Sequence, residues 1–220
     1  DILFYINLFI EYEDYFLGLE NNFPAHDIDN IRAAMSILFA ILMIEEKIDI
    51  DNRKDWKQFV LKSLNILKSF KRLPHRFEIL TTESNIIYIN DSKATNIHSM
   101  LNALDSVSKR YGLRKAILIC GGDTKNQDLK LLQDIPSHLI KRAIIFGQDK
   151  DLIFHNMKDK KNTIIVDSMK EAVNFASSQA SSGDVILLSP AAASTDMYLD
   201  YMERGREFII YYGREDEKIT

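Results

Sequence analysis

Apolar residues recur at helical spacing in the first third of the chain. Between Asp27 and about Glu46 they are three and four positions apart, and a second stripe of this kind runs from about Asn52 to Phe70. This period places apolar side chains along one face of a helix, so two packed helices are expected here. Residues 1 to about 23 are aromatic and β-branched around Gly18, which predicts one or two strands.

A different pattern begins after Pro74. Two apolar runs, Phe77–Leu80 and Ile86–Ile89, flank the polar Glu83-Ser84-Asn85 and predict a hairpin. Short apolar runs then alternate with helical stretches. The runs lie at 116–120, 143–146, 163–166 and 185–188, and the helical stretches near 97–110, 149–158, 168–180 and 196–212. This alternation predicts an α/β fold, a Rossmann-like and mostly parallel sheet with helices on both faces.

The two patterns indicate two domains. We place their boundary at Arg72 to Pro74, which gives residues 1–72 and 73–220. The chain starts directly in an apolar stretch without an initiating Met. We therefore expect it to start inside a domain.

Composition excludes several classes of protein. The 220 residues carry a net charge of −4, with Lys and Arg scattered among Asp and Glu, so a nucleic-acid partner is not expected. The longest apolar run, Met35–Ile44, is about half of what a bilayer crossing needs. Cys120 is the single cysteine, so we interpret it as a small buried hydrophobe and expect a reducing cytoplasm.

A group of polar residues follows the apolar run Ile86–Ile89. The heptad Asn90–Asn96 brings together a carboxylate, an ammonium and two hydroxyls at the end of a predicted strand, which is where open α/β sheets bind ligands. Lys93 and Thr95 are two positions apart, so in an extended turn both would face one ligand.

A second ammonium follows another predicted strand. Lys125 comes shortly after Gly121-Gly122, and glycines allow close approach of the backbone. With Lys93 it would suit an anionic substrate that has two carboxylates. Taken alone, Gly-Gly-Asp-Thr-Lys also fits a generic turn.

Ser194 stands where the last predicted strand leads into the final helix. It could be the N-cap of that helix, with Asp196 supporting the first turn, and a helix start also binds carboxylates. No Gly-x-Ser-x-Gly sequence surrounds it, so a serine nucleophile is not expected.

Four stretches together resemble the C-terminal domain of the Mur ligases, and most closely the branch that adds D-glutamate. They are Leu73–Glu78, Asn90–Asn96, Gly121–Lys125 and Leu188–Ser194, with Glu203-Arg204-Gly205 beyond. The resemblance implies an ATP-dependent amide ligase. ATP with Mg²⁺ would phosphorylate the alanine carboxylate of UDP-N-acetylmuramoyl-L-alanine, and the amine of D-glutamate would attack the acyl phosphate.

The resemblance also implies roles for individual residues. The residues at the D-glutamate positions are Lys93, Thr95, Lys125, Ser194 and Tyr201, the last in place of the usual Phe. The residues at the nucleotide positions are Asp27, Asn30, Arg76 and Asp91. Arg76 would contact phosphates, Asp91 the ribose hydroxyls, and Asn30 the adenine.

Two nucleotide positions also have a plainer interpretation. Asp27 stands where the family usually has Asn, so one amide donor is lost, and a carboxylate is also ordinary in the first turn of a helix. The guanidinium of Arg76 suits phosphate oxygens, and the alternative is a surface group paired with Glu78 across a turn.

The phosphate-binding loop of the Mur ligases is not found in this sequence. Neither Gly-x-x-x-x-Gly-Lys-Ser/Thr nor its shorter form occurs, and the histidines lack zinc-ligand spacing. We expect 1–72 to be the end of the central ATP-binding domain and 73–220 the C-terminal domain. Alone, this fragment is expected to be inactive and monomeric, with small-molecule partners and no membrane partner.

The same architecture is compatible with other protein families. Other Mur ligases and folylpolyglutamate synthases share it, but their strand-end motif usually contains a proline that Ser92–Asn96 lacks. A non-catalytic Rossmann-like ligand-binding or regulatory module is the alternative from another class. A dinucleotide-binding module would need Gly-x-Gly-x-x-Gly after a strand, and this sequence does not contain it.

Overall fold

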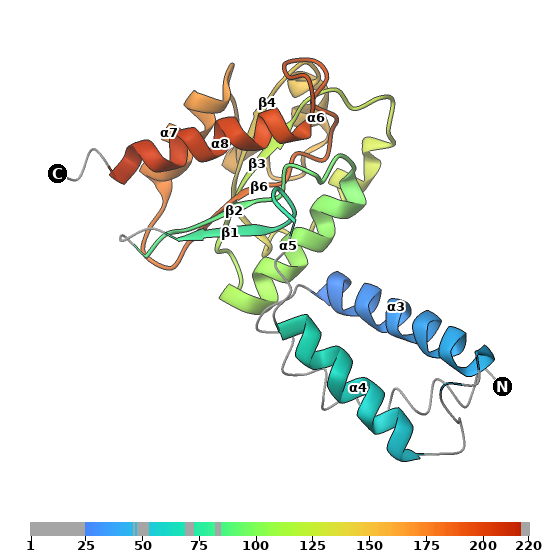
Figure 1. Cartoon of the computed structure of the whole chain (residues 1–220). Helices are drawn as coiled ribbons and strands as arrows, with labels where there is room; N and C mark the ends of the chain where they lie inside the picture. The colour runs from blue at the N-terminus through green and yellow to red at the C-terminus, as the bar shows by residue number, and fades with distance from the viewer. Residues whose placement is uncertain (1–24, 46, 48–52, 69–72, 82–84, 217–220) are drawn as a thin grey trace. The chain divides into compact units, whose positions relative to one another are not determined.

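The chain forms two compact units, and each is described by itself. The computed structural model describes residues 25–45, 47, 53–68, 73–81 and 85–216 (Figure 1). The units are Asp1–Lys71 and Arg72–Thr220, so the division lies beside the boundary expected from the sequence. The strands predicted before residue 24 lie outside the described residues. No helix in the described ranges is long and apolar enough to cross a bilayer.

The first unit contains the two predicted helices, α3 (Ala25–Ile44) and α4 (Arg53–Lys68). Their buried side chains form one cluster, in which the rings of Phe39 and Phe59 have centroids 5.4 Å apart. Leu38, expected on the buried stripe, is instead 47% exposed. The apolar residues of α3 extend around more of the helix than α4 covers, which explains the difference.

The second unit is built on the predicted sheet. The hairpin strands β1 (Glu78–Thr81) and β2 (Ile87–Asn90) pair antiparallel. The other strands are β3 (Ala116–Gly121), β4 (Ile140–Phe146), β5 (Thr163–Ile165) and β6 (Val185–Leu188). Their order is β1-β2-β6-β3-β4-β5, and every pair except β1 with β2 is parallel. The expected α/β class is confirmed.

Helices cover both faces of this sheet (Figure 1). The helices are α5 (Ile97–Tyr111), α6 (Lys150–Asn156), α7 (Met169–Gln179) and α8 (Tyr201–Asp216), with short 3-10 turns η1 (Leu129–Leu132) and η2 (Lys160–Asn162). Side chains of α5, η1 and α6 pack with Leu118 and Leu187 on one face. Those of α7 and α8 pack with Ile119 and Leu188 on the other.

The central strands are buried on both faces, which explains their continuous apolar sequences. Every residue of β3 and β6 is buried. Cys120 lies in β3, and burial raises the pKa of its thiol to about 12. It is therefore a protonated, small core residue, as expected.

The final helix begins later than the sequence predicted. The expected start was near residue 196, whereas α8 begins at Tyr201. Its first turn is capped by Asp200, whose Oδ1 accepts a hydrogen bond from the Glu203 backbone N–H at 2.8 Å. In return, the Glu203 carboxylate accepts from the Leu199 N–H at 2.7 Å. Ser194 is therefore not the N-cap of this helix, and that interpretation was wrong.

The chain crosses the sheet in one direction from β2 to β5 and then returns to form β6 between β2 and β3. From β2 it passes through α5 to β3, and β6 later fills the place between these two strands. After β2 the chain continues on the α5 face, and after β6 it continues on the α8 face. Such a switch point opens a crevice at the carboxyl ends of the strands, and the polar loops identified above lie there.

Candidate functional site

Three loops meet at the carboxyl edge of β2, β6 and β3. The loops after β3 and β6 form an isolated antiparallel bridge, because Asp123 and Ala193 exchange N–H···O bonds of 3.1 and 2.8 Å. The loop after β6 also joins the loop after β2, since the Ala191 N–H donates to the Ala94 carbonyl at 2.9 Å. Lys93, Thr95, Lys125 and Ser194 all lie on these connected loops.

The loop after β2 is a tight turn and not an extended one. The Ala94 N–H donates to the Asp91 carbonyl at 2.9 Å, and the Thr95 N–H to the Lys93 carbonyl at 2.8 Å. The argument that Lys93 and Thr95 share a side by strand alternation was therefore wrong. The Lys93 ammonium lies 4.2 Å from the ring centroid of Tyr201, a cation–π contact that brings together two of the predicted residues.

Gln127 links the loops, and no sequence motif indicated this role. Its Nε2 donates to the carbonyls of Thr95 at 3.3 Å and Ala191 at 3.2 Å. Its Oε1 accepts from the N–H of Ile97, at the start of α5, at 3.3 Å. The amide thus fixes the backbone at Thr95, one of the predicted positions.

Lys125 is presented outward by a local turn. Its φ is 49°, and its N–H donates to the Asp123 Oδ1 at 2.8 Å. The side chain is exposed and forms no ion pair with any residue that the structure describes. The ammonium is therefore available to an anion.

Ser194 is buried within the loop after β6. The residue is 4% exposed, and among the described residues its hydroxyl has no hydrogen-bond partner. Its carbonyl accepts from the N–H groups of Met197 at 3.1 Å and Tyr198 at 2.8 Å. A buried hydroxyl normally has a partner, so this group indicates a partner from outside the described chain.

Arg76 projects from a strained turn. Its neighbours His75 and Phe77 are buried and have φ values of 64° and 47°, a conformation that persists in non-glycine residues only when the surroundings enforce it. The enforcing contacts include the bond from the Lys93 N–H to the His75 carbonyl at 3.0 Å. The turn thereby holds an exposed guanidinium beside the heptad loop.

The alternative pairing of Arg76 with Glu78 is wrong. The Glu78 Oε2 instead accepts from the His75 N–H at 3.0 Å and from the Asn90 Nδ2 at 3.2 Å. In the described part of the chain, Arg76 has no carboxylate partner.

Asp91 is held in place from two sides. Its Oδ1 accepts from the Phe77 N–H, and its Oδ2 from the Ser189 hydroxyl, both at 3.0 Å. It therefore lies next to the Arg76 turn and to the loop after β6. The other predicted nucleotide residues, Asp27 and Asn30, lie on α3 in the first unit, with Asp27 in the first turn as expected.

A fully buried arginine underlies all three loops. The Arg204 Nε donates to the Ser92 Oγ at 3.0 Å, and its Nη2 donates to the Ser92 carbonyl at 2.9 Å. Its Nη1 donates to the carbonyls of Ala192 at 3.1 Å and Gly121 at 3.5 Å. We did not predict this role, and the Glu203-Arg204-Gly205 sequence was the single signal for it.

The Arg204 guanidinium remains charged at neutral pH. Burial lowers its pKa to about 10, while Asp196 and Tyr198 act in the opposite direction. No carboxylate among the described residues forms an ion pair with it. Among the described residues the guanidinium therefore donates its hydrogen bonds to backbone and hydroxyl oxygens, while Asp196 acts on it from beyond ion-pair distance.

Comparison with known proteins places this architecture in a family. The model of the family described as "Mur ligase, glutamate ligase domain" matches residues 75–192, which contain the loops after β2 and β3 and the start of the loop after β6. The chain belongs to the Mur ligase family.

Similar Mur ligases are known from several bacteria. The chain is 38% identical over 184 residues to UDP-N-acetylmuramoylalanine--D-glutamate ligase of Shewanella oneidensis, covering 84% of this chain and 37% of that protein. It is 34% identical over 188 residues to the protein of that name in Francisella philomiragia, covering 86% of this chain and 41% of that protein. The chain thus spans about two fifths of the length of these curated relatives.

Solved Mur ligase structures share the fold. UDP-N-acetylmuramate-alanine ligase from Thermotoga maritima superposes with a TM-score of 0.57 at 19% sequence identity, covering 88% of this chain and 39% of that one. At this identity the likeness shows the fold alone, and it agrees with the expected α/β architecture.

The loop after β3 is also anchored to the loop after β4. The hydroxyl and the N–H of Thr124 both donate to the Asp149 Oδ2, at 2.6 and 2.8 Å. These two bonds, the hydroxyl first, lower the pKa of the Asp149 carboxyl. Because the carboxylate form is favoured in the folded state, this anchor stabilises the fold above the unfolded-state pKa of about 4. The stabilisation is lost as the pH falls through the folded-state value.

Removing the Thr124 hydroxyl should therefore have a pH-dependent effect. Thr124→Val is expected to cost about 1 kcal/mol in the free energy of unfolding at pH 7, because one charge-assisted hydrogen bond is lost at a partly exposed site. The cost should be smaller at about pH 3 than at pH 7, because protonation of the carboxyl, which increases as the pH falls toward its lowered pKa, removes the charge that strengthens this bond. Urea unfolding at both values of pH measures it, with Thr195→Val at an exposed hydroxyl as the control. An equal cost at both values would contradict the assignment.

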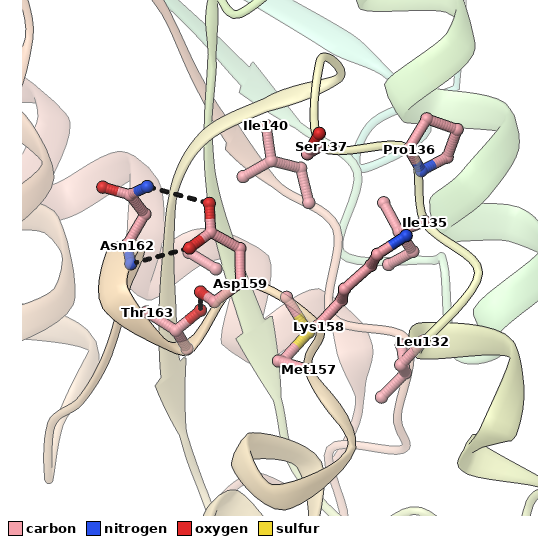
Figure 2. A pocket seen from close by; sticks show the side chains of 11 residues that line it. Leu132, Ile135, Pro136, Ser137, Ile140, Met157, Lys158, Asp159, Asn162 and Thr163 are labelled. Atoms are coloured by element: carbon pink, nitrogen blue, oxygen red, sulfur yellow. Dashed lines mark hydrogen bonds between the residues drawn. The ribbon is translucent and has the colours of Figure 1, made fainter.

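A separate hollow lies at the opposite edge of the sheet. Figure 2 shows its lining, which includes Ile135 and Pro136 before β4 and Met157 and Asn162 before β5. Since these residues precede the strands, the hollow lies at their amino ends, away from the three loops. Its polar side is closed by Asp159, which accepts two bonds from Asn162 at 3.3 and 2.8 Å. It therefore contributes nothing to the candidate site.

The described residues provide no metal centre of their own. No cluster of three or more His, Cys, Asp or Glu side chains within the described ranges is placed to bind a metal ion.

Proposed function

We propose that this chain is the D-glutamate-binding part of an ATP-dependent ligase that joins D-glutamate to UDP-N-acetylmuramoyl-L-alanine. The observation that carries the proposal is the joining of three strand-end loops that carry two lysines and a buried hydroxyl, which has no hydrogen-bond partner among the described residues. The names of the curated relatives support the choice of D-glutamate.

In this proposal each predicted residue of the second unit has a chemical task. Lys93 and Lys125 neutralise the two carboxylates of D-glutamate, and the hydroxyls of Thr95 and Ser194 donate hydrogen bonds to them. Tyr201 holds the Lys93 ammonium at its ring face, which orients that charge before the substrate arrives. Fixed cations reduce the reorganisation needed when an anion binds.

The nucleotide lies beside this seat in the same proposal. Arg76 contacts the ATP phosphates, and its exposed guanidinium and unpaired state among the described residues fit that task. Asp91 would contact the ribose. In the first unit Asn30 would contact the adenine, next to Asp27, which stands at the position where the family usually has Asn. ATP supplies the phosphoryl group that activates the alanine carboxylate, while Mg²⁺ neutralises its phosphates.

Completion of the site requires groups beyond this sequence. The phosphate-binding loop and the uridine site would come from other parts of a longer protein, of which residues 1–72 form the end of the central domain. The proposal further places the ligase in the cytoplasm as a monomer that acts in peptidoglycan synthesis.

A ligation assay tests the proposal. The 220-residue chain, given ATP, Mg²⁺, D-glutamate and UDP-N-acetylmuramoyl-L-alanine, should form no amide product. A protein that contains this chain and spans the length of its curated relatives should form the product, with release of ADP and phosphate. Turnover by the short chain would overturn its expected inactivity. Binding of D-glutamate by the longer protein without product would favour a non-catalytic binding module and overturn the ligase proposal.

A further inference from the structure

We infer that Arg204 is a positioning residue that holds the proposed D-glutamate seat together, an inference that rests on the proposed function. Its side chain is fully buried and reaches acceptors at the base of three loops, at Ser92 after β2, at Gly121, the last residue of β3, and at Ala192 after β6. None of the residues proposed to contact D-glutamate reaches all three loops by itself in the described contacts.

Each acceptor lies close in sequence to a residue proposed to bind the substrate. Ser92 precedes Lys93, Ala192 lies two positions before Ser194, and Gly121 begins the Gly-Gly sequence that leads to Lys125. A shift of the guanidinium would therefore change the spacing of groups that must meet one small ligand. An error of about 1 Å in such spacing costs much of the advantage of a preformed site.

The same guanidinium fixes the cation–π contact. Arg204 lies three residues after Tyr201 on α8, and its Nε donates to the Ser92 hydroxyl. That hydroxyl donates in turn to the Tyr201 carbonyl at 2.7 Å. Arg204 and Ser92 thus join the first turn of α8 to the loop that carries Lys93.

Arginine is costly at this position, which argues against a role in packing alone. A buried cation bound only to neutral oxygens loses its hydration without gaining an ion pair, and an apolar side chain of similar volume would often be as stable. A planar fork with five N–H donors reaches several loops at once, which an ammonium on a flexible stem cannot reproduce. The contacts to the three loops therefore require both the length of the arginine side chain and the several donors of its planar guanidinium.

Arg204→Lys tests this role, and Arg206→Lys on the exposed side of the same helix is the matched control. D-Glutamate affinity is measured by NMR titration of the 220-residue chain. We expect Arg204→Lys to weaken binding at least tenfold and Arg206→Lys to change it less than twofold. Equal affinity of Arg204→Lys and the unaltered chain would overturn the inference.

Amide hydrogen exchange provides a readout that needs no ligand. In Arg204→Lys the amides of Lys93, Asp123 and Ala193 should exchange at least tenfold faster, while those of β4 and α7 stay unchanged. Unchanged exchange in the three loops would overturn the inference. If the unaltered chain binds no D-glutamate, the proposed function fails, and the exchange comparison still decides the positioning role.

Ser92→Ala covers the case in which Arg204→Lys does not fold. It removes one hydroxyl and leaves the guanidinium bonds to the backbone carbonyls. Faster exchange confined to the Lys93 loop and the first turn of α8 is expected. No change in either segment would contradict the link between Arg204 and the Lys93–Tyr201 contact.

Discussion

Lys125→Met is expected to weaken D-glutamate binding about thirtyfold, with little change in stability. The ammonium is exposed and has no ion pair among the described residues, so its removal costs the fold little. In the proposed complex it neutralises a substrate carboxylate, and loss of one partner of such a pair costs about 2 kcal/mol. NMR titration with D-glutamate measures the effect, and urea unfolding measures the stability.

Lys130→Met is the matched control for this substitution. Lys130 is exposed on η1 and lies outside the three loops, but it carries the same charge. We expect it to alter the affinity less than twofold. If both substitutions weaken binding to the same extent, net charge and not a defined seat controls the affinity.

Gly121→Ala is expected to destabilise the second unit by at least about 4 kcal/mol, an effect typical of severe steric conflict. Gly121 has a φ of 129°, and an added Cβ would lie 1.8 Å from the carbonyl oxygen of Phe146 in β4. Gly121 and Phe146 both lie in buried parts of their strands, so neither backbone can move away without disturbing the core. Urea unfolding, followed by NMR signals of the buried Ile117 and Ile186, measures the loss.

Gly112→Ala is the control that distinguishes the cost of the backbone conformation from the cost of the steric collision at Gly121. Gly112 also has a positive φ, 101°, but an added Cβ would meet nothing within 4 Å. Its substitution should cost only the conformational strain, about 2 kcal/mol. Equal losses at the two positions would show that the close approach of β4 to Gly121 does not determine the effect.

The two glycines at the end of β3 are needed for a reason that differs from the one expected. The sequence suggested that Gly121 and Gly122 allow the backbone to approach a ligand. In the structure their close neighbours are protein backbone, and an added Cβ at Gly122 would lie 2.1 Å from the carbonyl oxygen of Ala193. The glycines therefore permit the loops after β3, β4 and β6 to pack together.

Most of the sheet was predictable because its burial is visible in the sequence. β6 coincides with its predicted span, Val185–Leu188, since a strand buried on both faces is a continuous apolar run with polar ends. The start of α8 was missed because Ser194 and Asp196 look like a helix start. The true cap, Asp200 with Glu203 three residues later, is also a recognisable capping pattern in the sequence.

The residues that hold the three loops together could not be predicted from local sequence patterns. Arg204 and Ser92 are bonded across 112 residues, and Gln127 reaches Ala191 across 64. Such contacts depend on the strand order, in which β6 is inserted between β2 and β3. Sequence motifs pointed to residues on the three loops, while the residues that hold the loops together became visible only in the fold.

The most direct test of the proposed seat is a chemical-shift map of the ¹⁵N-labelled chain with D-glutamate and, separately, with an equal concentration of L-glutamate. The proposal predicts that the amides of Thr95, Lys125 and Ser194 shift together, and more with the D-isomer. Shifts that are equal for the two isomers, or that fall instead around Ile135 and Asn162 at the opposite edge of the sheet, would contradict it.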